Sequence, residues 1–158
     1  MPKAFEDVYH FNHVDAHVEK LKDRLSTAKY LVDNLDTIGK LVKGTAWSVR
    51  AIYDMIGCGE KVAYKLVEGS EKKVTGLLIM ATNDMPKGPM LCYEWLTYGG
   101  KLPFEDLAEM CDTIAIYSGY TFTSAFVRPG ITKKYGKTLK KLGYTTRKHL
   151  YIKTTGRY

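Results

Sequence analysis

Apolar and polar residues in the second half of the chain follow a strand–helix–strand order. Met90–Tyr98 is a largely apolar run that predicts a strand, and Pro103–Ser118 carries apolar residues at helical spacing. Tyr120–Val127 predicts a second strand, after Gly119 has ended the helix. A strand, a helix and a returning strand form a crossover that sets the two strands side by side in parallel. The loop at 97–102 then lies beyond the carboxyl end of a strand, where open α/β sheets bind ligands.

The first sixty residues predict mainly helices. Phe5–Phe11 alternates weakly and predicts a first strand. Asn12 predicts the N-cap of a helix whose apolar residues lie at helical spacing, namely Val14, Val18, Leu21 and Leu25. Ser26 predicts the cap of a second helix that ends at Gly39, with one apolar face made of Ala28, Leu31, Val32, Leu35 and Ile38. Thr45–Ile56 fits a third helix, although Trp47 and Val49 also fit a strand.

From Lys61 onward the apolar period changes to that of strands. Val62–Glu68 and Val74–Thr82 predict a hairpin, because a turn-rich Gly-Ser-Glu-Lys-Lys segment joins them. Residues 83–89 contain too much proline and glycine to continue a strand, so they predict a turn. Beyond the crossover, Thr132–Leu142 predicts a helix capped by Gly143, and Thr145–Lys153 predicts a closing strand.

Length and composition indicate one domain spanning residues 1–158, with a single buried core. No run of apolar residues is long enough to span a bilayer, and the first twelve residues lack the apolar segment of a secretory signal. The three cysteines are scattered, without the spacing of a zinc site or a disulfide framework. We therefore expect reduced cysteines and a cytoplasmic location.

Positive charge is concentrated in the last third of the chain. The net charge is +7, yet the first 112 residues hold 14 basic and 17 acidic side chains. After Asp112 the sequence contains no acidic residue and ten basic ones, five of which lie in the predicted helix: Lys133, Lys134, Lys137, Lys140 and Lys141. This asymmetry favours a polyanionic partner, either a phosphate-rich cofactor or nucleic acid, over a merely solvated basic face. Lysines without matching arginines favour sequence-independent phosphate contacts over the reading of bases.

The order of the predicted elements and one C-terminal motif resemble the GNAT superfamily of acyl-CoA-dependent N-acetyltransferases. The similarity covers about Lys61 to Lys153, where a hairpin precedes alternating strands and helices. Its most specific part is the strand Tyr-Thr-Phe-Thr-Ser-Ala-Phe-Val-Arg-Pro at 120–129, followed by a helix and by Leu-Gly-Tyr at 142–144. The resemblance implies an α/β fold with a GNAT-like mixed sheet. It also implies a V-shaped splay between two central parallel strands, and helices on both faces.

The resemblance further implies a site for acetyl-CoA or another acyl-CoA in that splay. The backbone at Leu96, Thr97 and Tyr98 would hold the acyl-pantetheine arm, and Gly99, Gly100 and Lys101 would meet the pyrophosphate. Members of the superfamily hold that pyrophosphate on a basic, glycine-rich loop and a helix N-terminus. Here the helix begins with Pro103, which lacks an N–H group, and Glu105 and Asp106 would repel phosphate. The phosphate loop of this chain is therefore degenerate.

Two positions bear on catalysis. Glu94 lies between Tyr93 and Trp95 on the predicted central strand, where a buried carboxylate can act as the general base for an amine acceptor. The alternative is a structural glutamate bonded to a lysine or tyrosine. The superfamily's usual proton donor to the leaving thiolate is a tyrosine four residues before the glycine of the Leu-Gly-Tyr motif. That position is Leu139, which cannot donate a proton.

The other reactive side chains support structural interpretations. Cys92 shares a strand face with Glu94 but has no nearby histidine to activate it, so covalent catalysis is disfavoured. His13 and His17 have a spacing that suits a metal on a helix, but no third ligand is evident, so we predict no metal site.

A narrower similarity links the chain to the small GNAT-like internal virion proteins of short-tailed phages. That similarity rests on the leucine and lysine in the turn before the motif glycine, on the poorly formed phosphate loop and on the compact, basic, tyrosine-rich composition. Two functions therefore stay open. One is acyl-CoA-dependent N-acylation of an amine acceptor. The other is a non-catalytic role in a virion, in which the basic last third binds nucleic acid or a host or virion protein.

Overall fold

The computed structural model describes residues 2–59, 61–70, 73–97, 101–127 and 132–145. Of residues 57, 73 and 132–134 within these ranges, only the backbone is described. The elements in chain order are β1 (Val8–His10), β2 (Ala16–Lys20), α1 (Arg24–Asp33), α2 (Leu35–Val42), α3 (Val49–Cys58), β3 (Lys61–Glu68), β4 (Lys73–Met85), β5 (Gly88–Thr97), α4 (Phe104–Ser118), β6 (Phe122–Ala125) and α5 (Thr132–Lys141).

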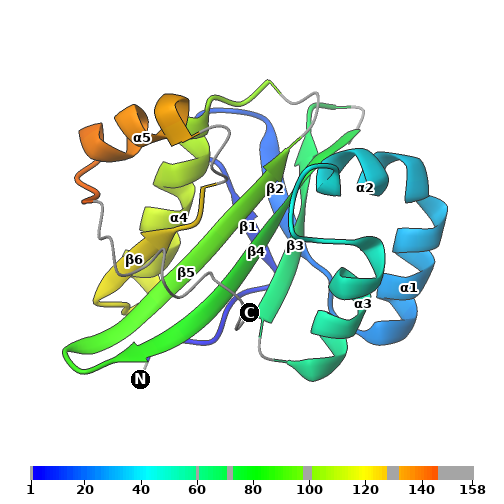
Figure 1. Cartoon of the computed structure of the whole chain (residues 1–158), viewed down its shortest axis with the longest axis horizontal. Coiled ribbons are helices and arrows are strands. Elements are labelled where there is room, and N and C mark those ends of the chain that lie inside the picture. The colour runs from blue at the N-terminus through cyan, green and yellow to red at the C-terminus, as the bar shows by residue number, and fades with distance from the viewer. Residues whose placement is uncertain (1, 60, 71–72, 98–100, 128–131, 146–158) are drawn as a thin grey trace.

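The six strands form one sheet in the order β1-β2-β3-β4-β5-β6. Neighbouring strands from β1 to β5 pair antiparallel, whereas β5 and β6 pair parallel. The helix α4 connects these two parallel strands along the chain. The long β4–β5 hairpin crosses the middle of the molecule (Figure 1). The mixed sheet and its parallel β5–β6 pair confirm the predicted fold class.

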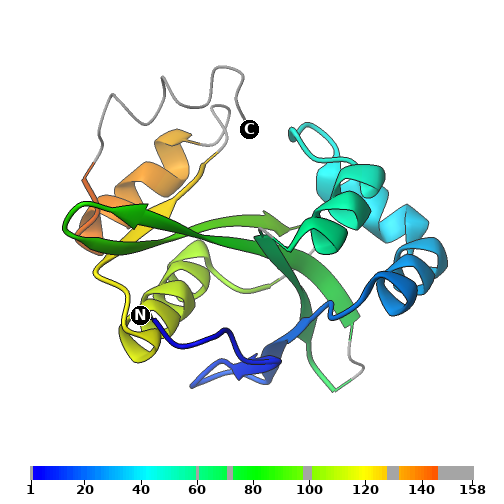
Figure 2. The same ribbon diagram turned by 90° about the horizontal axis from the view of Figure 1, so that it is seen from below.

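Helices cover both faces of the curled sheet, as Figure 2 shows. On one face, α4 packs over a core that includes Val18, Tyr64, Leu91 and Tyr93. On the other face, helices α1 to α3 cover a second core that contains Ala63, Leu77, Ile79, Leu96, Ile38 and Ile52. Since successive strand residues point to opposite faces, β5 contributes Tyr93 to the first core and Leu96 to the second.

Helix α4 follows the prediction closely. Pro103 is its N-cap, and Gly119 ends it with a left-handed backbone at φ 87°. Leu107, Ala108, Cys111, Ile114 and Ala115 are buried, as the apolar stripe indicates. No helix in the described ranges is both long enough and apolar enough to cross a membrane.

The helix predicted from Asn12 is wrong. Ala16–Lys20 is strand β2, which pairs antiparallel with β3 and with the short strand β1. The apolar residues at helical spacing overlap a two-residue alternation, in which Ala16 and Val18 are buried while His17 and Glu19 are half-buried. The edge of β3 was available for pairing, and that tertiary contact decided between the two periods.

The second predicted helix exists as two shorter ones. Asp23 caps α1, since its Oδ1 accepts a hydrogen bond of 2.8 Å from the backbone N–H of Ser26, the residue predicted as the cap. Asn34 separates α1 from α2, and its side-chain amide donates to the carbonyl of Tyr30 at 2.8 Å. Because the break turns the two helices, Val32 and Leu35 are exposed rather than on the buried face. The third predicted helix is confirmed as α3, capped by Ser48.

The predicted turn at 83–89 is mostly strand. Asn83, Asp84 and Met85 continue β4, and β5 begins at Gly88, so only Pro86 and Lys87 form the turn. Gly88 has φ 143°, and a Cβ there would lie 2.1 Å from Oγ1 of Thr121. This close approach, which only glycine permits, lets the hairpin reach the start of β6. The predicted closing strand lies outside the described residues apart from Thr145.

Candidate active site

The two parallel strands separate after a short paired segment. Their register runs from Met90↔Phe122 to Tyr93↔Ala125, and the N–H of Phe126 donates to the carbonyl of Tyr93 at 2.9 Å. β5 continues to Thr97, still paired with β4 on its other edge. The β6 side of β5 beyond Tyr93 is therefore left without a strand partner among the described residues. This is the splay that the sequence predicted.

A small cavity lies at the splay. It is lined by residues from β5, α4, α5 and the segment after β6, including Tyr93, Glu94, Trp95, Phe104, Phe126 and Tyr135. Its volume is about 10 Å³, which is room for a single water molecule. The lining includes three consecutive residues of β5, which alternate between the two faces of the strand.

Glu94, the predicted base, is half-buried in this lining. Its Oε1 accepts a hydrogen bond of 2.8 Å from the indole N–H of Trp47, in the loop between α2 and α3. The backbone N–H of Trp47 donates to the hydroxyl of Thr45 at 3.0 Å, which fixes the loop. The ammonium of Lys61 lies 5.3 Å from the centre of the Trp47 ring. Trp47 and Glu94 are far apart in sequence, so no local pattern could have identified their contact.

The predicted cofactor-binding residues lie in different environments. Leu96 is buried in the core beneath α1 to α3, and Thr97 is exposed at the end of β5. Lys101 is exposed, and its backbone N–H donates to Glu68 at 3.2 Å. Tyr98, Gly99 and Gly100 lie outside the described residues.

Helix α5 covers the start of α4. The rings of Phe104 and Tyr135 stack with their centres 4.0 Å apart and 11° between their planes. Nζ of Lys141 lies 3.6 Å from a carboxylate oxygen of Glu105. The first turn of α4, where a phosphate would meet the helix N-terminus, is thus in contact with an aromatic ring and an ammonium group of α5.

Two tyrosine hydroxyls and a carboxylate form a hydrogen-bonded network in the partly buried region near β5. The hydroxyls of Tyr93 and Tyr144 are 2.9 Å apart, and the Tyr144 hydroxyl donates to Oδ1 of Asp112 at 2.5 Å. Burial raises the pKa of the Asp112 carboxyl, although the bond from Tyr144 acts in the opposite direction. Burial also raises the pKa of both tyrosines above the usual 10.0. The sequence offered Tyr144 only as part of a motif, and its three-residue network was missed.

The predicted basic helix is only partly described. Lys137, Lys140 and Lys141 are exposed, while the side chains of Lys133 and Lys134 lie outside the described set. Leu139, which occupies the position of the expected proton donor, is buried. Tyr135 lies one helical turn before Leu139 on the same face and lines the splay cavity.

Two histidines pack together on β1 and β2, and two cysteines lie on β5 and α4. His17 is on β2, where its Nε2 lies 2.7 Å from Glu19 and its ring packs on His10. Cys92 is half-buried on β5, and Cys111 is fully buried. Within the described ranges, no group of three or more such side chains could hold a metal ion.

Comparison with solved structures finds the same architecture in acetyltransferases. An aminoglycoside N-acetyltransferase in complex with CoA aligns over 89% of this chain and 94% of its own, with a TM-score of 0.56 and 8% identity. Glucosamine-6-phosphate N-acetyltransferase from Arabidopsis thaliana aligns over 84% and 92%, with a TM-score of 0.53 and 14% identity. This chain has the GNAT acetyltransferase fold.

The fold is also shared with an integron cassette protein from the mobile metagenome of V. cholerae. That protein aligns over 85% of this chain and 88% of its own, with a TM-score of 0.59 and 14% identity. No protein-family model matches the sequence, and no curated protein is significantly similar to it. The likeness is therefore one of fold, and the identities are too low to carry an activity across.

Proposed function

We propose that this protein is an N-acyltransferase of GNAT type, which transfers an acyl group from an acyl-CoA to an amine. The observation that carries this proposal is Glu94 in the lining of the splay between β5 and β6. The acyl arm would lie along the unpaired edge of β5, and the carboxylate would meet the amine acceptor from the side of α1 to α3. The fold shared with a CoA-bound acetyltransferase supports this assignment.

The chemistry needs a base and a proton donor, and we assign both roles to residues that line the cavity. An acyl-CoA supplies the acyl group activated as a thioester. Glu94 takes a proton from the acceptor ammonium, so that the amine lone pair can form the new C–N bond to the acyl carbon. As the C–S bond breaks, the leaving thiolate needs a proton. Tyr135 lines the same cavity, and its phenol is the donor we assign, in place of the missing one at Leu139.

Neither end of an acyl-CoA finds a fully formed site in this structure. A cavity of about 10 Å³ cannot admit a pantetheine arm until the ring of Tyr135 moves off Phe104. Pro103 contributes no N–H group at the helix start, and Glu105 adds a negative charge that Lys141 partly offsets. We therefore expect weak acyl-CoA binding, in accord with the degenerate phosphate loop.

The direct test is release of CoA from acetyl-CoA in the presence of a panel of primary amines. Glu94→Gln keeps the size of the side chain but removes the base, and should lower kcat by about 100-fold or more. Asp33→Asn, an exposed change at the end of α1, is the matched control and should keep full activity. Equal rates for Glu94→Gln and the wild type would exclude Glu94 as the base.

The small size of the cavity at the splay favours a second candidate function. Aromatic side chains fill the splay, and exposed lysines lie on α5. These features suit a GNAT-derived protein that has lost catalysis and binds nucleic acid or a virion or host protein, as the likeness to phage internal virion proteins implies. Phosphate contacts by lysines would make nucleic-acid binding weaken steeply with salt. Binding that does not change with salt would remove α5 as its cause.

A further inference from the structure

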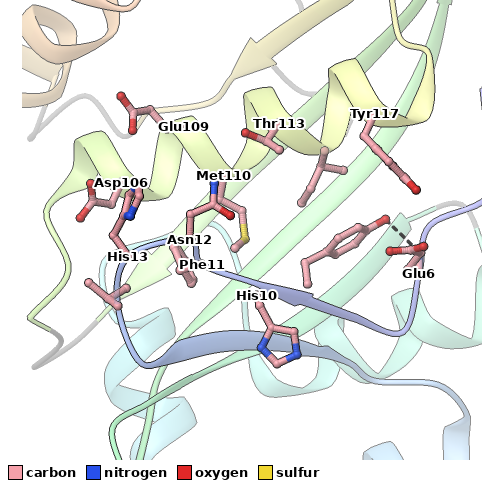
Figure 3. A pocket seen from close by; sticks show the side chains of 13 residues that line it. Glu6, His10, Phe11, Asn12, His13, Asp106, Glu109, Met110, Thr113 and Tyr117 are labelled. Atoms are coloured by element: carbon pink, nitrogen blue, oxygen red, sulfur yellow. Dashed lines mark hydrogen bonds between the residues drawn. The ribbon is translucent and has the colours of Figure 1, made fainter.

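A second cavity, larger than the one at the splay, lies beside α4. It opens between this helix and the N-terminal strands, and its volume is about 330 Å³, within the range of small-molecule sites. Figure 3 shows α4 along one side and the segment around β1 along the other, with Met110 pointing from the helix toward the strands. This cavity and the splay cavity share no lining residue, so a ligand here would not be the acceptor at Glu94.

The floor of this cavity is apolar and aromatic. Tyr9 and Phe11 line it from the N-terminal strand side, and Met110 and Ile114 line it from α4. The hydroxyl of Tyr9 accepts a hydrogen bond of 2.8 Å from the backbone N–H of Glu6, and Tyr9 also packs on Tyr64. These contacts hold the floor in place before any ligand arrives, which lowers the entropy cost of binding.

The lining carries negative charge in a protein whose net charge is +7. Glu6, Asp106 and Glu109 contribute three carboxylates, and none of the lining residues is a lysine or arginine. Among the described residues, none of these carboxylates forms an ion pair. Two histidines, His10 and His13, are the other titratable rings besides the tyrosines.

One aromatic ring of the lining contacts an ammonium group of the chain itself. The ammonium of Lys3, which is not itself a lining residue, lies 4.5 Å from the centre of the Tyr117 ring. A ring that holds one ammonium group on its face is a surface suited to such groups. Aromatic walls, carboxylates without ion-pair partners and a preformed apolar floor together describe a site for an organic cation.

We propose that this cavity binds a small alkylammonium ligand. Its apolar stem would pack on Phe11 and Met110, and its ammonium group would be held by Asp106, which is half-buried, and Glu109 one turn further along α4. Glu6 lies at the opposite end of the cavity from Asp106 (Figure 3). An ammonium held by carboxylates is a charge-assisted interaction, so it is stronger than a neutral hydrogen bond. This site does not depend on acyl transfer at the splay.

The test is calorimetric titration of the whole protein with 1,5-diaminopentane at low salt, without acetyl-CoA. We expect saturable binding at one site, weakened about tenfold or more in Asp106→Asn/Glu109→Gln. Glu105→Gln is the matched control, since it removes the same charge from the same helix turn but does not line the cavity. It should bind the diamine like the wild type.

Folding of each variant is checked by its circular dichroism spectrum. Glu6→Gln removes an exposed carboxylate at the opposite end of the cavity, so it should weaken binding less than the double variant does. The proposal is overturned if the wild type shows no saturable binding, or if the double variant binds as well as the wild type. It is also overturned if the neutral 1-pentanol binds as tightly as the diamine. Failure of acetyl-CoA to bind would leave all of these results unchanged, so the two proposals are tested separately.

Discussion

The indole N–H of Trp47 donates a hydrogen bond of 2.8 Å to the carboxylate of Glu94. This bond joins the loop after α2 to the central strand β5, at the point where β6 leaves it. It also fixes one carboxylate oxygen, which orients the side chain in the lining of the splay. The helical layer formed by α1 to α3 is thereby connected to the candidate active site.

A double-mutant cycle measures this contact. Trp47→Phe removes the N–H donor while keeping an aromatic ring, and should lower the free energy of unfolding by about 1.5 kcal/mol, the usual value for a bond to a charged group. Combined with Glu94→Gln, the two effects should be less than additive in urea unfolding. Strict additivity would mean that the two side chains do not interact in solution.

Two substitutions of Tyr135 distinguish its packing on Phe104 from its proposed role as the acid. Tyr135→Phe keeps the ring and should change the free energy of unfolding little, but it removes the proposed acid and should lower kcat about 100-fold. Tyr135→Leu loses the stack as well, and should lower stability by about 1 kcal/mol. A Tyr135→Phe enzyme as fast as the wild type would reject the acid role and keep the packing role.

Replacement of two glycines by alanine should change the stability of the protein in opposite directions. Gly88→Ala places a Cβ 2.1 Å from Oγ1 of Thr121 at a φ of 143°, so it should destabilise the protein markedly. Gly136 is in helix α5, and nothing lies within 4 Å of a Cβ added there. Gly136→Ala should therefore raise the free energy of unfolding by about 0.5–1 kcal/mol. Thermal unfolding of both variants checks the pair, and a stable Gly88→Ala would contradict the tight hairpin.

The half-buried carboxyl of Asp112 should make stability depend on pH. Burial raises its pKa in the folded state above the ordinary 3.8, so the folded protein binds the proton more tightly than the unfolded chain does. The stabilisation is complete below the unfolded pKa and is lost as the pH rises through the folded one.

Asp112→Asn cannot ionise, so it isolates this effect. In urea unfolding between about pH 4 and pH 7, the wild type should lose stability relative to the variant as the pH rises. A stability difference that stays constant, or that grows in favour of the wild type, would show that Tyr144 compensates fully for the burial.

Local signals were enough to predict much of the fold. Proline at 103, glycine at 119 and the apolar stripe between them defined α4, because helix caps and periodicity act within a few residues. Strand β2 was missed because its short alternation overlaps a helical spacing, and only pairing with β3 decides between them. The strand part of 83–89 was missed because proline and glycine there accommodate a two-residue turn.

The candidate site was only half predictable. Glu94 and the splay followed from the resemblance and from the order of strand, helix and strand. The partner Trp47, the ring of Tyr135 on Phe104 and the network from Tyr93 to Asp112 all join residues that are distant in sequence. No periodicity or motif encodes such contacts, because they depend on how separate elements pack.

Acyl-CoA binding in the splay is the central claim, and thermal unfolding with acetyl-CoA tests it most directly. At about 100 times its Kd, a ligand of the folded state adds about 2.7 kcal/mol of stability. We predict that acetyl-CoA at millimolar concentration raises the Tm of the wild type and of Glu94→Gln, while ATP, which carries phosphates but no acyl arm, does not. An unchanged Tm in millimolar acetyl-CoA, or an equal rise with ATP, would contradict the claim.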